Sequence, residues 1–311
     1  MALALQERGI GRRDWLEWIT GVVAFREMPR DQVDRVVEWM LQQEILWDDQ
    51  GILWLGQKGE ETYGRRNFLE LFSVFVSPPL FSVLHGRQGL GYVDELTFLG
   101  KQDGPRILLL GGRAWRVNHI DWQRKVAHVE ATDAKGRSRW KGQGPGLTYR
   151  MSQAIKRVLA TEDSRDLWSR RAKQQLDEIR IEFPWVETTN SQIAHSSDSE
   201  LTWWTFAGNG ANATIANELA HITRSRVDHD NFTLTFATHV DTADLERTVD
   251  ELRTREVAEL RPSIDDRAID GLKFSACLSR DLGMHVLEQR LLDRPAVSDL
   301  LETPLRIVTT T

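Results

Sequence analysis

Between residues 67 and 139 the apolar side chains stop recurring at helical spacing and fall into short runs and alternations. Glycine and proline interrupt these runs at Pro78-Pro79, Gly100 and Gly111-Gly112, as in strands joined by tight turns. The predicted strands cover residues 68–76, 81–84, 90–99, 107–110, 115–120 and 126–130. Strands in such close succession predict a small β-barrel or a strongly curled sheet.

The first 65 residues have a different pattern, which follows the order of a winged helix. Apolar residues recur at helical spacing after Pro29, at Val33, Val36, Val37, Met40 and Leu41. A shorter helix is expected at 15–19, and residues 45–47 and 52–55 flank the turn sequence DDQG as a hairpin. The longer helix mixes acidic residues with its arginines. We therefore expect this winged helix to pack or clamp rather than to read bases.

From residue 147 onward the pattern becomes mixed. Helices are expected at 147–159, 164–179, 212–222, 243–260 and 282–292, and strands at 201–206 and 232–236. The polar run 187–200 is the best candidate for a mobile loop. The predicted fold class is α+β, with a winged helix at 1–65, a barrel-like part at 66–146 and a helical and mixed α/β part at 147–311. A chain of 311 residues can hold two or three such domains.

Charge is distributed unevenly along the chain. Residues 101–160 hold 13 Lys and Arg against 4 Asp and Glu, a charge of +9, whereas the remaining residues together carry −15. The basic stretch also contains GGRAWRV at 111–117 and WKGQGPG at 140–146, where cations alternate with indole rings and glycines. Cations bind phosphates and indole rings stack on bases, so this stretch predicts a single-stranded nucleic acid, DNA or RNA, as the partner.

Tryptophan is the aromatic residue that this chain favours, with 12 Trp against 3 Tyr. Trp203 and Trp204 are consecutive on a predicted strand, where neighbouring side chains point to opposite faces. One of the two is therefore expected to be half exposed.

The candidate nucleic-acid contacts lie in the basic stretch. Gly142 and Gly144, with Gly146, would let backbone amides approach a phosphate, and the helix that follows would add its N-terminal dipole. Trp140 and Trp115 would stack on bases, although a buried position fits Trp115 equally well. The full set is Arg113, Trp115, Arg116, Arg137, Arg139, Trp140, Lys141, Gly142, Gly144, Arg150, Lys156 and Arg157.

Catalytic and metal-binding motifs are missing from the sequence. No GxxxxGK[ST] phosphate loop occurs, since Lys141 precedes its glycines, so this chain alone should not hydrolyse ATP. Asp94-Glu95 fits a polar strand end better than a magnesium motif. The histidines lack metal-site spacing, and the single Cys277 lies among apolar residues as a buried thiol would. We expect no cofactor, no metal, no membrane partner and a cytoplasmic location.

Five segments of the chain resemble large helicase-related (Lhr) proteins and occur in the same order. They are RRNFLELFSVF (65–75), HGRQGLGYVDELTF (85–98), LLLGGRAWRVNHID (108–121), WKGQGPGLTYRMSQAIKRVL (140–159) and WWTFAGNGANATIANEL (203–219). The resemblance covers residues 14–307 and corresponds to the region after the two motor domains. It implies a winged helix and a final core domain that close over a single strand, with DNA repair as a setting. The family's phosphate loop, DExH box and arginine finger have no counterpart here, so a motor subunit, or motor domains of the same protein, would supply ATP hydrolysis.

Two other function classes stay open. Related barrel and winged-helix modules occur in DNA glycosylases that use paired Gln and Asp chemistry, for which Gln175 and Asp177 are the only candidate pair. Residues two apart on a helix do not share a face, which disfavours a glycosylase. The second alternative is a protein–protein assembly subunit that uses exposed tryptophans and acidic helices.

Overall fold

The computed structural model describes residues 1–23, 29–64, 71, 80–101, 105–132, 146–161, 168–195, 201–236 and 240–309. The chain forms two compact units. The first contains Met1–Pro79 and Ile269–His285, and the second contains Leu80–Ala268 and Val286–Thr311. The chain passes between the units at three points, the last of which falls within helix α10 (Arg280–Leu291). The first unit is therefore built from two separate stretches of chain.

The first unit combines short helices with a three-stranded sheet in the order β1-β3-β2. Its elements from the N-terminal stretch are α1 (Ala2–Gln6), β1 (Ile10–Gly11), the 3-10 helix η1 (Glu17–Ile19), α2 (Arg30–Gln42), β2 (Leu46–Asp49), β3 (Ile52–Leu55), α3 (Gln57–Gly59) and the π-helix η3 (Glu60–Gly64). The later stretch adds the 3-10 helix η6 (Ser275–Cys277). Strands β2 and β3 form an antiparallel hairpin.

The longer helix and the hairpin form where the sequence predicts them. Helix α2 begins directly after Pro29, with Val33 and Met40 buried. Gln50 and Gly51 have positive φ angles of 53° and 86°, which is the geometry of a type I′ hairpin turn. The predicted helix at 15–19 is reduced to the single 3-10 turn η1. The identification of this unit as a winged helix stays a prediction.

The core of the first unit depends on both stretches of chain. Cys277 is buried among residues that include Met40, Leu46 and Leu53, as the sequence predicted for this thiol. Its sulfur lies 3.8 Å from the Tyr63 hydroxyl oxygen, and burial raises the pKa of the thiol. The late stretch is therefore part of the packing that stabilises α2 and the hairpin.

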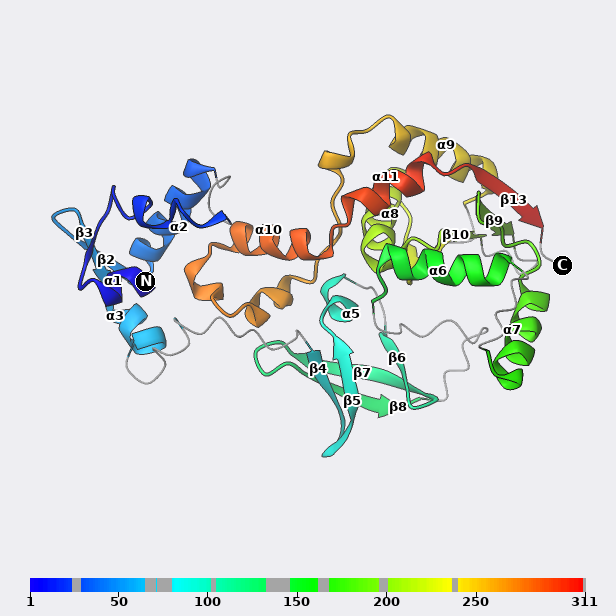
Figure 1. Ribbon diagram of the computed structural model, residues 1–311, viewed down its shortest axis with the longest axis horizontal. Helices are drawn as coiled ribbons and strands as arrows, with labels where there is room; N and C mark the ends of the chain where they lie inside the picture. Colours follow the sequence, from blue (N-terminus) through cyan, green and yellow to red (C-terminus); the bar gives the residue numbers. More distant parts are fainter. Residues whose placement is uncertain are drawn as a thin grey trace. The chain divides into compact units, whose positions relative to one another are not determined.

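The second unit contains a curled five-stranded half-barrel, which confirms the predicted curled sheet (Figure 1). Its order is β5-β4-β8-β7-β6, in which β4 and β8 are parallel and the other neighbours antiparallel. The strands are β4 (Leu80–His85), β5 (Gln88–Asp94), β6 (Ile107–Leu110), β7 (Arg113–Asp121) and β8 (Val126–Ala131). The strand predicted at 68–76 falls outside the described residues except for Leu71.

The strand predicted at 90–99 is too long. It ends at Asp94, whose Oδ1 accepts a hydrogen bond of 2.9 Å from the amide of Leu96. That contact starts the short helix α5 (Leu96–Leu99). Phe98 on α5 is fully buried, with its ring 5.0 Å from that of Phe81 on β4. The helix therefore contributes to the core under the curled sheet.

A second five-stranded sheet has the order β11-β12-β10-β9-β13. Its strands are β9 (Ser191–His195), β10 (Leu201–Trp204), β11 (Val227–His229), β12 (Thr233–Phe236) and β13 (Leu305–Thr309). Strand β9 lies within the run 187–200 that the sequence indicated as a loop, so that prediction is wrong for residues 191–195. Its neighbours β10 and β13 supply the pairing that its own polar sequence does not indicate.

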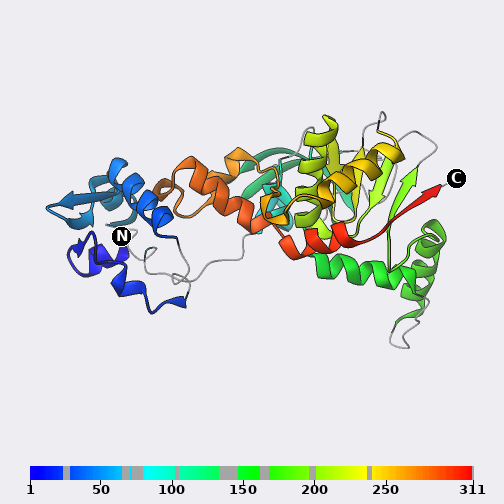
Figure 2. The same ribbon diagram turned by 90° about the horizontal axis from the view of Figure 1, so that it is seen from above.

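Helices α8, α9 and α11 pack against this sheet (Figure 2). The helices of this part are α6 (Tyr149–Ala160), α7 (Arg170–Glu182), α8 (Gly208–Thr223), α9 (Thr242–Arg253) and α11 (Arg294–Glu302). The helix predicted at 243–260 ends at Arg253. Two 3-10 helices follow it, η4 (Val257–Glu259) and η5 (Asp266–Gly271). The sequence pattern does not predict α11, β11 or β13. Among the described residues, none of the helices has the length and apolar character needed to span a bilayer.

Candidate nucleic-acid interface

Half of the predicted contact residues lie in the segment 133–145, outside the described residues. They are Arg137, Arg139, Trp140, Lys141, Gly142 and Gly144. The described chain resumes at Gly146, whose amide donates to Thr97 Oγ1 at 3.3 Å. The next amide, of Leu147, donates to Asn231 Oδ1 at 2.8 Å. These two amides are bonded within the protein, so the expectation that Gly146 presents its amide to a phosphate is wrong.

Trp115 is a core residue rather than a stacking surface. Its side chain is 7% exposed, and its Nε1 donates a 3.0 Å hydrogen bond to the carbonyl oxygen of Leu110. The sequence carried a signal for this, because Trp115 and Val117 alternate with the exposed Arg116 along β7. Trp115 is therefore not part of the candidate interface.

Lys156 is also buried, at 2% exposure, although it was expected to contact phosphate. Its Nζ donates a 2.6 Å hydrogen bond to the carbonyl oxygen of Asn190. Burial lowers the pKa of Lys156 to about 8. Two serines nearby are fully buried, namely Ser152, one turn earlier on α6, and Ser191. Neither hydroxyl has a hydrogen-bond partner among the described residues. Lys156 thus anchors α6 inside the unit, and its side chain cannot contact a nucleic-acid strand.

The outward face of α6 keeps two of the predicted contacts. Arg150 and Arg157 are exposed, and neither has an ion-pair or hydrogen-bond partner for its guanidinium among the described residues. They are seven residues apart, so they share one face at about 10 Å along the axis. Beside them lie Met151 and Val158, exposed at 54% and 37%. This face, which we call the α6 face (Arg150, Met151, Arg157 and Val158), combines cations with apolar side chains.

The remaining two predicted contacts lie on β7. Arg113 is exposed directly after the turn Gly111-Gly112, whose φ angles are 59° and 73°. Arg116 is exposed on the strand and pairs with Glu130 of β8 at 3.4 Å. An exposed pair of this kind is weak, so a phosphate can compete for the guanidinium of Arg116.

Two further cations of the basic stretch have internal partners that the sequence pattern does not indicate. The guanidinium of Arg106 donates 2.7 Å hydrogen bonds to the carbonyl oxygens of Thr97 and Gly100, and burial lowers its pKa to about 10. The Nζ of Lys125 lies 3.0 Å from Glu95 Oε1, and the Glu95 side chain is 3% exposed. Local charge in the sequence therefore overstates the charge available on the surface.

Aromatic side chains gather at a second place in the same unit. Trp203 is fully buried and Trp204 is half-buried, as strand alternation predicted. The Trp204 ring lies 5.0 Å from that of Phe183 and 5.5 Å from that of Trp185. These contacts hold the segment after α7 against β10.

The pair considered for glycosylase chemistry lies on α7. Gln175 and Asp177 are both exposed, and Asp177 is 3.4 Å from the guanidinium of Arg180. Among the residues that the structure describes, no group of three or more His, Cys, Asp or Glu side chains could hold a metal ion. The exposed arginines in the described part of the basic stretch include Arg113, Arg116, Arg150 and Arg157.

The chain matches no protein-family model, no curated protein and no solved structure.

Proposed function

We propose that this chain is a single-strand nucleic-acid clamp of an Lhr-type ATP-dependent helicase. The α6 face is the observation that carries the proposal. Arg150 and Arg157 are exposed cations without partners in the described part of the chain, and the exposed Met151 and Val158 beside them offer apolar surface to sugars and bases. Phosphate contacts supply most of the affinity in sequence-independent binding, and apolar contacts add to it.

The segment 133–145, which precedes Gly146 in the sequence, supports the same proposal by its composition. It contains four more cations, a tryptophan and three glycines. Arg113 and Arg116 would extend the contact onto the curled sheet. The five Lhr-like segments in family order supply the assignment to a helicase, in which residues 1–65 of the first unit would be the winged helix and would pack or clamp.

In this proposal a separate motor subunit, or motor domains of the same protein, hydrolyses ATP and pulls the strand. The sequence has no phosphate loop with which to hold the β- and γ-phosphates itself. The clamp would hold the tracking strand, DNA or RNA, and so set processivity. DNA repair is the setting that the family resemblance suggests.

Fluorescence anisotropy with labelled single strands at two or more salt concentrations tests the proposal. We expect binding to be weak and to fall steeply as salt rises. Arg150→Ala and Arg157→Ala should each lower the affinity for all sequences, and each should flatten the slope of log K against log salt by about 0.7 to 1, the value for one lost phosphate contact.

The matched control is Arg247→Ala on α9, an exposed arginine outside the basic stretch whose guanidinium pairs with Asp244. It should bind like the unmodified protein. Parallel titrations with DNA and RNA strands identify the preferred polymer. If the unmodified protein binds neither strand, or if both α6 variants keep the original salt slope, the proposed clamp is wrong or its contact surface lies elsewhere.

A further inference from the structure

The curled sheet of the second unit has two different faces. On the inner face Phe81, Val83 and Ala127 are fully buried. The ring of Phe98 on α5 covers this face and lies 5.0 Å from that of Phe81. Successive side chains of a strand point to opposite sides, so the residues between the buried ones lie on the outer face. The inner face therefore belongs to the core, and the outer face has to be considered separately.

The outer face carries exposed aromatic rings. Tyr92 on β5 is 70% exposed, compared with 57% for Trp18 and 58% for Trp47 in the first unit. His128 on β8 and His119 on β7 are exposed opposite each other. Their imidazole rings are nearly parallel, at 25°, with centroids 6.1 Å apart. Planar rings at a surface offer their faces to another planar group.

The strand register places the tyrosine and the histidine pair on the same face. Tyr92 is opposite Ser82 on β4, and Ser82 is opposite Val126 on β8. His128 follows Val126 by two residues and therefore points to the same side. With strands about 4.8 Å apart and about 3.3 Å per residue along a strand, Tyr92 and His128 are separated by roughly 12 Å. At this spacing each ring can stack on a different base of one strand.

Two arginines lie at one end of the sheet. Arg87 is in the turn between β4 and β5, and Arg113 follows the turn between β6 and β7. The two turns are at the same end, since the rings of His85 and Trp115 beside them are 5.2 Å apart. Both arginines are exposed, and neither guanidinium has a hydrogen-bond or ion-pair partner among the described residues. Such a guanidinium can bind a phosphate.

The carboxylates of the sheet are already occupied. Strands β4 to β8 and the three hairpin turns among them contain five Lys and Arg against three Asp and Glu. Asp94 and Asp121 each accept a 2.9 Å hydrogen bond from a nearby backbone amide. Glu130 pairs with Arg116 at 3.4 Å. The charge left over on this surface is therefore positive and complements a polyanion.

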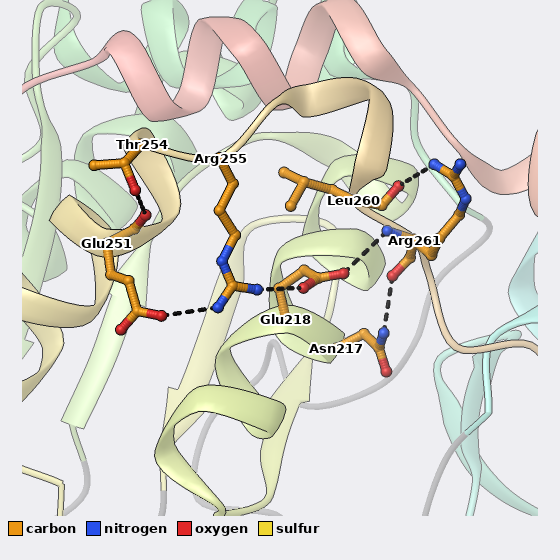
Figure 3. Close-up of polar contacts among 7 residues, drawn as sticks. All are labelled: Asn217, Glu218, Glu251, Thr254, Arg255, Leu260 and Arg261. Carbon is orange, nitrogen blue, oxygen red and sulfur yellow. Dashed lines mark hydrogen bonds and ion pairs between the residues drawn. The ribbon is translucent and has the colours of Figure 1, made fainter.

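Arginines of another part of the same unit show the opposite arrangement (Figure 3). Arg255 pairs with Glu218 at 3.3 Å and with Glu251 at 2.8 Å. The guanidinium of Arg261 donates a 2.9 Å hydrogen bond to the carbonyl oxygen of Leu260, and its amide donates one of 3.1 Å to Glu218 Oε1. These contacts hold the segment after η4 on α8. The arginines there serve the packing of the fold, as those at the turns of the curled sheet do not.

We propose that the bases of the single strand stack on the outer face of the curled sheet, which we call the sheet platform (Arg87, Tyr92, Arg113, His119 and His128). This inference rests on the proposed clamp function, in which the α6 face holds phosphates. The ring of Tyr92 would take one base and the histidine pair another, while the two arginines would bind phosphates. Every base has a flat face, so these contacts would not select a sequence.

Two labelled strands of equal length test the sheet platform by fluorescence anisotropy. One is an oligothymidylate, and the other has the same sugars and phosphates without bases. Tyr92→Ala should lower affinity for the strand with bases by about fivefold or more and leave affinity for the abasic strand unchanged. Tyr92→Phe keeps the ring and should bind both strands like the unmodified protein. His128→Ala should have the same selective effect as Tyr92→Ala.

Variants of other residues separate stacking from other effects. Arg113→Ala should lower affinity for both strands by the same factor, because a phosphate contact does not depend on the base. The matched control is Ile181→Ala on α7, which removes an apolar side chain that is 78% exposed and lies outside the sheet platform. It should bind both strands like the unmodified protein. A thermal melt of each variant verifies that it folds.

The outcomes distinguish the sheet platform from the clamp. If Tyr92→Ala and His128→Ala bind the strand with bases as tightly as the unmodified protein, or weaken both strands alike, the sheet platform is wrong. The clamp would still stand in that case if Arg150→Ala and Arg157→Ala flatten the salt slope. If the unmodified protein binds neither strand, the clamp fails and the sheet platform fails with it.

Discussion

Strands β6 to β8 of the curled sheet and helix α6 all lie in the basic stretch 101–160, and two pairs of cations in this stretch have opposite surroundings. In the curled sheet and the segments beside it, Arg106 and Lys125 bond to groups inside the protein. On α6, Arg150 and Arg157 extend into solvent without partners among the described residues. Equal charge in the sequence therefore gives internal contacts at Arg106 and Lys125 and an open cationic surface at Arg150 and Arg157.

The reason lies in the backbone. A helix satisfies most of its own carbonyl oxygens, so an arginine on its outer face finds no acceptor there. The carbonyl oxygens of Thr97 and Gly100 accept hydrogen bonds from Arg106, which supplies one donor to each. Lys156 follows the same rule, because its acceptor Asn190 lies in an irregular segment just before β9.

The largest expected effect is the loss of Arg106. Arg106→Met keeps the bulk of the side chain but leaves the carbonyl oxygens of Thr97 and Gly100 without donors, which should lower the free energy of unfolding by about 3 to 5 kcal/mol. Urea denaturation measures it. The control Arg113→Met removes an exposed cation of the same stretch and should stay within about 0.5 kcal/mol. Similar losses in both variants would abolish the distinction between the two kinds of cation.

The next largest expected effect is the pH dependence that Lys156 gives to the free energy of unfolding. The pKa of Lys156 is about 8 in the folded chain against 10.5 for an unperturbed lysine, so between these values the unfolded chain binds more protons. The free energy of unfolding should therefore rise as pH increases from 8 to 10.5, by on the order of 3 kcal/mol for this lysine. Below pH 8 both states are protonated and this contribution is constant.

Denaturant unfolding at several pH values, carried out on the unmodified protein and on Lys156→Met, separates the contribution of Lys156 to the free energy of unfolding from that of other titrating groups. The difference between the two curves should climb through this window and level off above it. A constant difference would mean that Lys156 is solvated in the folded protein.

A smaller loss in the free energy of unfolding is expected when the buried Glu95 loses one of its cationic partners. Lys125→Met removes the nearer of its two cations and leaves Arg290, whose guanidinium is 3.7 Å from Glu95 Oε2. Because one partner remains, we expect a loss of about 2 kcal/mol, below the usual cost of breaking a buried pair. Adding Glu95→Gln to Lys125→Met should recover part of this loss in a double-mutant cycle. The adjacent Arg124→Met, at an exposed arginine, serves as the control.

Elements that depend on local pattern could be predicted from the sequence. Helix α2, the β2–β3 hairpin and strands β4, β6, β7 and β8 follow from apolar spacing and turn residues. Strand β9 could not, because its pairing with β13 joins segments that are far apart in the sequence. The burial of Lys156 had no local signal either, since the carbonyl oxygen that it bonds belongs to a residue 34 positions away. Trp115 did carry a signal, in its alternation with Arg116.

The composition of the first unit affects the order in which the protein can form during synthesis. Its core needs Phe274 and Cys277, and Trp39 on α2 donates to the carbonyl oxygen of Ala276 at 3.1 Å. Residues 80–268 are made between the two stretches of this unit. At roughly 5 to 20 residues per second, the early stretch waits on the order of 10 to 40 s for its partner. During that interval its apolar face is open to chaperones and to other nascent chains.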